Sequence, residues 1–140
     1  MTTPDATGVR PIRGSCLCGA VRFEIRGPLG AMSHCHCAMC RKAHGAAFGT
    51  YSSVKRSDFA LLSAAGSIVS YRSSPTVTRT FCSTCGATLQ WITDDRPDAL
   101  DIAIGTLDDD PGIRPSLHIF TASKAPWFEI TDGLPQRAAR

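Results

Sequence analysis

The chain has 140 residues and a formal net charge of +3, from 15 lysine and arginine side chains against 12 aspartate and glutamate side chains. Hydrophobic residues make up 43% of it, which is enough for one packed domain and excludes disorder by composition. The sequence has no dense basic run and no aromatic-interleaved basic stripe, so nucleic acid is not an expected partner. The longest apolar runs are four residues, such as 59–62, so no membrane association is expected either.

The two ends of the chain are polar. We expect a single domain over residues 12–135, with residues 1–11 and 136–140 as flexible ends. The first residues, MTTPDATGVRPIRGS, contain no apolar stretch of the kind that a secretory signal needs, so we expect a cytoplasmic protein.

Short strands dominate the predicted secondary structure. In residues 21–25, apolar side chains alternate with charged ones, which is typical of a half-buried strand. Further strands are expected, from alternation or from threonine, aromatic and β-branched residues, at 48–54, 68–71, 77–81, 88–92 and 100–104. Turns are expected at 73–75 and 94–98, and a turn of helix around 37–44. The sequence therefore predicts a mainly β domain of short antiparallel strands, with the cysteines in its loops.

Seven cysteines form three clusters, at 16–18, 35–40 and 82–85. An odd number cannot close entirely into internal disulfides, and a reducing cytosol disfavours them. Zinc is bound by a tetrahedron of sulfur or nitrogen ligands, and paired cysteines two or three residues apart can reach one ion from a tight turn. The third cluster has the shape of a zinc knuckle, in which Gly86 permits a positive φ.

Seven ligands divide most naturally into four and three. A closed structural zinc site needs four, so Cys82 and Cys85 require two partners, and Cys16 and Cys18 are a ready pair. The remaining ligands are Cys35, Cys37 and Cys40. Three protein ligands with an open fourth position are typical of a catalytic zinc, so we expect two zinc ions per chain.

Other interpretations remain open at this point. The third cluster could be a plain turn, and the second site could be purely structural, with a histidine as its fourth ligand. The candidates for that ligand are His34, His36, His44 and His118. His34 and His36 alternate with the cysteines, so an extended segment would turn them away from the metal. A thioredoxin-like redox site is disfavoured because no βαβ pattern surrounds the cysteines, and a sulfoxide reductase-like enzyme would need a spare nucleophilic cysteine.

Four segments of the sequence resemble one known family. They are GSCLCGAV at 14–21, HCHCAMCRK at 34–42, FCSTCG at 81–86, and the C-terminal stretch from His118 to Pro135. Together they resemble the glutathione-dependent formaldehyde-activating enzyme family, whose domain also occurs in centromere protein V. The resemblance covers residues 12–135 and implies a mainly β, Mss4-like zinc-binding fold with knuckle loops. It also implies the same four-plus-three assignment of structural and catalytic zinc ligands.

The resemblance implies a carbon–sulfur lyase that forms S-hydroxymethylglutathione from glutathione, or another small thiol, and formaldehyde or a related small aldehyde. Three thiolate ligands favour nucleophilic sulfur chemistry over strong Lewis acidity, which supports the same conclusion. We expect glutathione carboxylates to be bound by Arg41 or Lys42, with Lys124 and Trp127 as further substrate-binding candidates. The alternative is a non-catalytic zinc module that binds a partner protein, with both zinc ions structural.

Overall fold

The computed structural model describes residues 10–140, so the expected flexible segment 1–11 lies almost entirely outside the described residues. Ten strands in this part of the chain form two sheets. The smaller sheet has the order β1-β2-β5. Its strands are β1 (Ile12–Ser15), β2 (Arg22–Ile25) and β5 (Phe59–Leu61).

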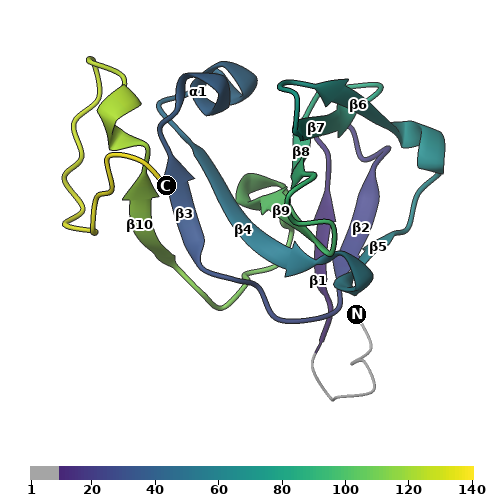
Figure 1. Ribbon diagram of the computed structural model, residues 1–140. Helices are drawn as coiled ribbons and strands as arrows, with labels where there is room; N and C mark the ends of the chain where they lie inside the picture. Colours follow the sequence, from purple (N-terminus) through teal and green to yellow (C-terminus); the bar gives the residue numbers. More distant parts are fainter. Residues whose placement is uncertain (1–9) are drawn as a thin grey trace.

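The larger sheet has seven strands in the order β10-β3-β4-β9-β8-β7-β6 and is strongly curved (Figure 1). Its strands are β3 (Met32–Cys35), β4 (Gly49–Lys55), β6 (Ile68–Arg72), β7 (Val77–Cys82), β8 (Thr88–Thr93), β9 (Ala99–Ala103) and β10 (Pro115–Ile119). The helix α1 (Ala38–His44) follows β3 directly and lies at one end of the large sheet (Figure 1). The mainly β class predicted from the sequence is confirmed.

Two features of the sheets differ from the expectation. The pair β10–β3 is parallel, whereas we expected only antiparallel strands. The strands β1, β3, β5 and β10 were not predicted, because three to five residues are too few to establish an alternating pattern. β1 and β3 also contain glycine, serine, histidine and cysteine, which carry little strand propensity.

The main hydrophobic core lies between the two sheets. The small sheet contributes Phe23 and Ile25, and the large sheet contributes Val54, Leu89 and Ile102, all almost completely buried. Since side chains alternate across a strand, the neighbours of these residues point to the other face of the large sheet. That second face carries a separate buried cluster of Cys35, Cys40, Tyr51 and Ala103, on which the functional site is built.

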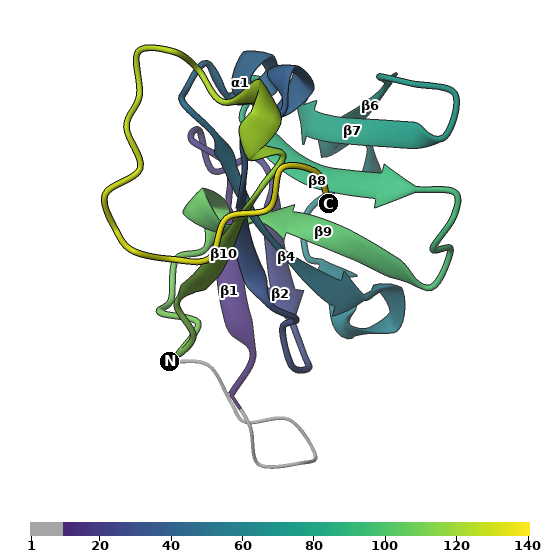
Figure 2. The same cartoon turned by 60° about the vertical axis from the view of Figure 1, so that its left-hand side comes forward.

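The C-terminal segment runs beside β10 (Figure 1). Residues 136–140, which we expected to be a flexible end, pair with β10 and the residues after it. Phe120, Thr121 and Ala122 donate backbone hydrogen bonds to Ala139, Arg137 and Ala138, at 3.0, 3.0 and 3.3 Å. The turned view shows this segment crossing from β10 toward the middle of the large sheet (Figure 2). None of the helices within residues 10–140 is long and apolar enough to cross a membrane.

Candidate metal and substrate site

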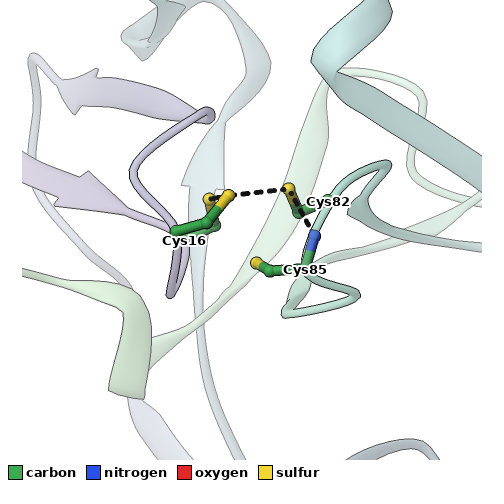
Figure 3. Close-up of side chains that lie close together, drawn as sticks. Cys16, Cys82 and Cys85 are labelled. Atoms are coloured by element: carbon green, nitrogen blue, oxygen red, sulfur yellow. Dashed lines mark hydrogen bonds between the residues drawn. The ribbon is translucent and has the colours of Figure 1, made fainter.

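Four cysteines meet where the two sheets come together. Cys16 and Cys18 lie in the turn after β1, Cys82 ends β7, and Cys85 lies in the turn that follows β7. All four sulfur atoms are within 4.8 Å of one another. Cys16, Cys82 and Cys85 point toward a common centre from two separate loops (Figure 3). The structure thus brings together the four residues that the sequence grouped, although 64 positions separate Cys18 from Cys82.

The spacing of these sulfurs fits a zinc ion. Four sulfurs at about 2.3 Å from a tetrahedral zinc lie about 3.8 Å from one another. The Sγ atoms of Cys16 and Cys18 are 3.6 Å apart, and those of Cys18 and Cys82 are 3.8 Å apart. A disulfide needs about 2.05 Å, and all seven cysteines are free.

Backbone amides surround the sulfurs of this group. The amide of Val21 donates to Cys16 Sγ at 3.2 Å, and the amide of Thr84 donates to Cys82 Sγ at 3.3 Å. Burial raises the pKa of Cys16, but hydrogen bonds with the Val21 amide and with the thiols of Cys18, Cys82 and Cys85 together outweigh burial and lower the pKa to about 6. Gly86 has a φ of 76°, as the knuckle pattern predicts. These donors favour thiolate sulfur, which is the form that binds zinc.

A second group of sulfurs lies at the corner between β3 and α1. Cys35 ends β3, Cys37 caps the helix and Cys40 lies in its first turn, with all three sulfurs within 4.8 Å of one another. The Sγ atom of Cys37 accepts the amide hydrogen of Cys40 at 3.3 Å. Hydrogen bonds with the thiols of Cys35 and Cys40 lower the pKa of Cys37, while the hydrogen bond with Cys37 raises the pKa of Cys35. Within residues 10–140, no further histidine, cysteine or carboxylate joins this group.

All three of these cysteines line a cavity of about 240 Å³. The cavity extends over the second face of the large sheet, where the register sets Tyr51 beside Ala103, Asp101 beside Trp91, and Trp91 beside Arg79. Its far side is formed by Ile119 and Phe120 at the end of β10 and by Arg140. The Arg140 guanidinium lies 5.4 Å from the centre of the Trp91 ring. The cavity therefore has three sulfurs at one place and charged side chains around them.

The four histidines have other partners. Nδ1 of His34 is 2.7 Å from Thr50 Oγ1, and Nε2 of His44 is 2.7 Å from Tyr51 Oη. Nε2 of His36 is 2.7 Å from Nδ1 of His118, whose Nε2 in turn lies 2.9 Å from the Asp132 carboxylate.

Strand alternation separates three of these histidines from the cysteines. His34 pairs in register with His118, and Cys35 pairs with Ile119, so the histidines of these strands point away from the cavity. Burial, and then the nearby charge of His118, lower the pKa of His36 to about 4, so its imidazole is neutral at pH 7. The histidine cluster ties the C-terminal loop to the segment that carries the cysteines.

The substrate-binding residues expected from the sequence lie elsewhere. Arg41, Lys42, Lys124 and Trp127 are not among the residues that line the cavity. The Lys124 ammonium donates to the backbone carbonyls of Ala125 and Phe128, and the Trp127 side chain is 70% exposed.

The cavity is instead lined by Arg79, Trp91, Asp101 and Arg140, none of which was predicted from the sequence as a site residue. The available signals were two charged residues inside predicted strands, Arg79 in 77–81 and Asp101 in 100–104.

Comparison with known proteins identifies the family. A family model described as glutathione-dependent formaldehyde-activating enzyme matches residues 11–123. The chain belongs to this family. A relative from Halomonas elongata, named as a candidate glutathione-dependent formaldehyde-activating enzyme, is 30% identical over 128 residues, which span 85% of this chain and 80% of the relative. The family name links the chain to an enzyme that acts on formaldehyde with glutathione.

A solved structure shares the fold. The crystal structure of a Rhodobacter sphaeroides protein superimposes with a TM-score of 0.60 at 25% identity, over 74% of this chain and 91% of that one. The family membership and the two cysteine groups agree with the family resemblance that the sequence motifs indicated. The two groups could hold metal ions, and their sulfur-only ligand sets suit zinc.

Proposed function

We propose that the protein is a zinc-dependent carbon–sulfur lyase that forms S-hydroxymethylglutathione from glutathione and formaldehyde. The observation that carries the proposal is that the sulfurs of Cys35, Cys37 and Cys40 line a cavity, with no fourth protein ligand among the described residues. Three protein ligands beside an accessible space are typical of a reactive zinc site, whereas four ligands close a structural one. We assign the structural zinc to Cys16, Cys18, Cys82 and Cys85.

The proposed reaction is an addition of sulfur to a carbonyl. Cys35, Cys37 and Cys40 would hold a zinc ion, and that ion would supply an ionised thiol nucleophile, because a coordinating thiol loses its proton. The sulfur of glutathione forms a bond to the carbonyl carbon of formaldehyde, the carbonyl π electrons move onto oxygen, and that oxygen takes up a proton. The cysteine ligands suit this role, because thiolates keep the site electron-rich where histidine and carboxylate ligands would make it more electrophilic.

The cavity also suits the charged ends of glutathione, which carries two carboxylates and an ammonium group. Arg140 and Asp101 both line the cavity, so we propose them as partners for a carboxylate and for the ammonium group. Asp101 also accepts hydrogen bonds from Arg96 at 3.1 and 3.2 Å, which fixes the orientation of its carboxylate. These residues replace Arg41 and Lys42 in the proposal, because neither lines the cavity.

The non-catalytic alternative required a histidine to close the second site. Each of the four histidines has another hydrogen-bond partner, and none joins the group of Cys35, Cys37 and Cys40. This arrangement favours an enzyme over a closed structural module.

Binding of two closely related ligands tests the proposal. S-methylglutathione keeps every charged group of glutathione but cannot ionise at sulfur. Calorimetry on zinc-loaded protein should therefore show glutathione binding at least about tenfold more tightly, which corresponds to about 1.4 kcal/mol. Cys37→Ser should remove that difference. Equal binding of the two ligands to the wild-type protein would show that the cysteines do not recognise the thiol.

Catalysis needs a separate measurement, because glutathione and formaldehyde also combine without an enzyme. Exchange NMR with ¹³C-labelled formaldehyde gives the rate at which the free aldehyde and the adduct interconvert. Zinc-loaded wild-type protein should raise this rate in proportion to its concentration, and Cys37→Ser protein should not. Tight glutathione binding without faster exchange would show that the protein binds glutathione but does not catalyse the addition.

A further inference from the structure

Arg79 is a buried cation beside the three cysteines. It lies in β7, only 8% of its surface is exposed, and its Nη2 donates to Cys40 Sγ at 3.7 Å. Its other two nitrogens, Nε and Nη1, are buried and have no hydrogen-bond partner within residues 10–140. Burying a guanidinium with unpaired N–H groups costs free energy, so the fold retains an unfavourable arrangement at this position.

The polar groups around Arg79 are already engaged. The Tyr51 hydroxyl is paired with His44, and the Asp101 carboxylate is paired with Arg96. Arg79 lines the cavity together with Cys37 and Cys40, and it stands in register with Trp91 on the adjacent strand. The cavity is therefore the place from which a further acceptor can reach this guanidinium.

The distance between Arg79 and Cys40 Sγ indicates which part of a substrate would carry that acceptor. A thiol that enters the cavity beside the three cysteines carries its first carbon close to their sulfurs. Because the guanidinium is 3.7 Å from Cys40 Sγ, it borders the same small space. The group it meets is therefore attached at or near that first carbon, whereas we assign a remote carboxylate of glutathione to Arg140 at the far side of the cavity.

We propose that Arg79 binds an anionic oxygen on the carbon attached to the substrate sulfur. This inference rests on the proposed function and names its substrate class: thiols that carry such an oxygen or acquire it by addition to an aldehyde. When the carbon–sulfur bond forms, the carbonyl π electrons become an alkoxide lone pair on that oxygen, and the guanidinium stabilises the charge until water supplies a proton. Fixed donors of this kind act where charge develops in the transition state.

Two sulfur compounds of nearly equal shape separate contact with the oxygen from contact with the sulfur, and a charge-keeping variant separates this role from a general effect of charge. Thioacetate has an oxygen on the carbon next to sulfur, and ethanethiol has hydrogens there. Their dissociation constants are measured by calorimetry on zinc-loaded wild-type, Arg79→Gln and Arg79→Lys proteins. Arg22→Gln, which removes an exposed arginine of β2, is the matched control.

Arg79→Gln should raise the dissociation constant of thioacetate at least about tenfold and change that of ethanethiol by less than about threefold. Arg22→Gln should change neither dissociation constant. Arg79→Lys keeps the positive charge but loses the planar guanidinium, so it should raise the dissociation constant of thioacetate about threefold to tenfold. This variant decides the question if Arg79→Gln does not fold. If Arg79→Gln weakens the binding of both thiols equally, or weakens the binding of neither, the role of Arg79 is overturned and the proposed function stays intact. Failure of both thiols to bind the wild-type protein contradicts the proposed function and this inference together.

Discussion

At the scale of single residues, Gly14 shows how closely the small sheet is packed. It stands in register with Phe23, and a Cβ atom at position 14 would lie 2.1 to 2.8 Å from three atoms of the Phe23 ring. Phe23 is buried in the main core and cannot move aside freely. Gly14→Ala should therefore reduce the free energy of unfolding by about 1–3 kcal/mol.

Urea unfolding followed by circular dichroism measures this effect. Gly66→Ala is the control, because a Cβ atom there meets nothing within 4 Å. If the two variants are equally stable, the ring of Phe23 has room to shift and the core is looser than the distances indicate.

The grouping of the cysteines could be predicted from the sequence far better than the rest of the candidate site. Cysteine has few roles, and its spacing limits which sulfurs can share an ion, so the clusters were visible without a fold. Arg79, Trp91 and Asp101 come from three different strands and meet only through the register of the large sheet. Strand alternation cannot distinguish a face that meets solvent from one that lines a cavity, so Arg79 could not be recognised as buried.

At the scale of secondary-structure elements, the C-terminal segment acts as a cover for the edge of β10. Phe120, Thr121 and Ala122 donate to backbone carbonyls of residues 137–139, while the amide of His118 donates to Pro135. Deletion of residues 137–140 should therefore speed hydrogen exchange at the three amides that lose their acceptors. Exchange at His118 should stay slow, since Pro135 remains.

Hydrogen exchange followed residue by residue by NMR checks this, and the His118 amide is the internal control. Slow exchange at all four amides after the deletion would mean that the tail contributes little protection, as expected for the flexible end that the sequence suggested. The paired tail was missed because its polar residues carry no strand pattern. They are held mainly by backbone hydrogen bonds from the residues just after β10, and backbone pairing leaves no mark in the side-chain sequence.

At the scale of the whole molecule, the two cysteine groups have different consequences for stability. Cys16 and Cys18 follow a strand of the small sheet, and Cys82 and Cys85 lie at the end of a strand of the large one. An ion between them would therefore join the two sheets across more than sixty residues. Cys35, Cys37 and Cys40 lie within six positions and join only β3 to α1. A cross-link that closes a long loop removes more entropy from the unfolded chain than one that closes a short loop.

Cys85→Ser and Cys37→Ser form a matched pair that tests this difference, because both cysteines are half-buried and each belongs to one group. A structural zinc contributes about 10–16 kcal/mol of apparent binding energy in small zinc domains. Whole domains are stable by only about 5–15 kcal/mol. Cys85→Ser should therefore leave the domain unfolded or insoluble, whereas Cys37→Ser should leave it folded with one zinc fewer per chain. Thermal unfolding and metal analysis of the purified variants measure both quantities. Equal loss of structure in the two variants would contradict the division into a structural and a reactive site.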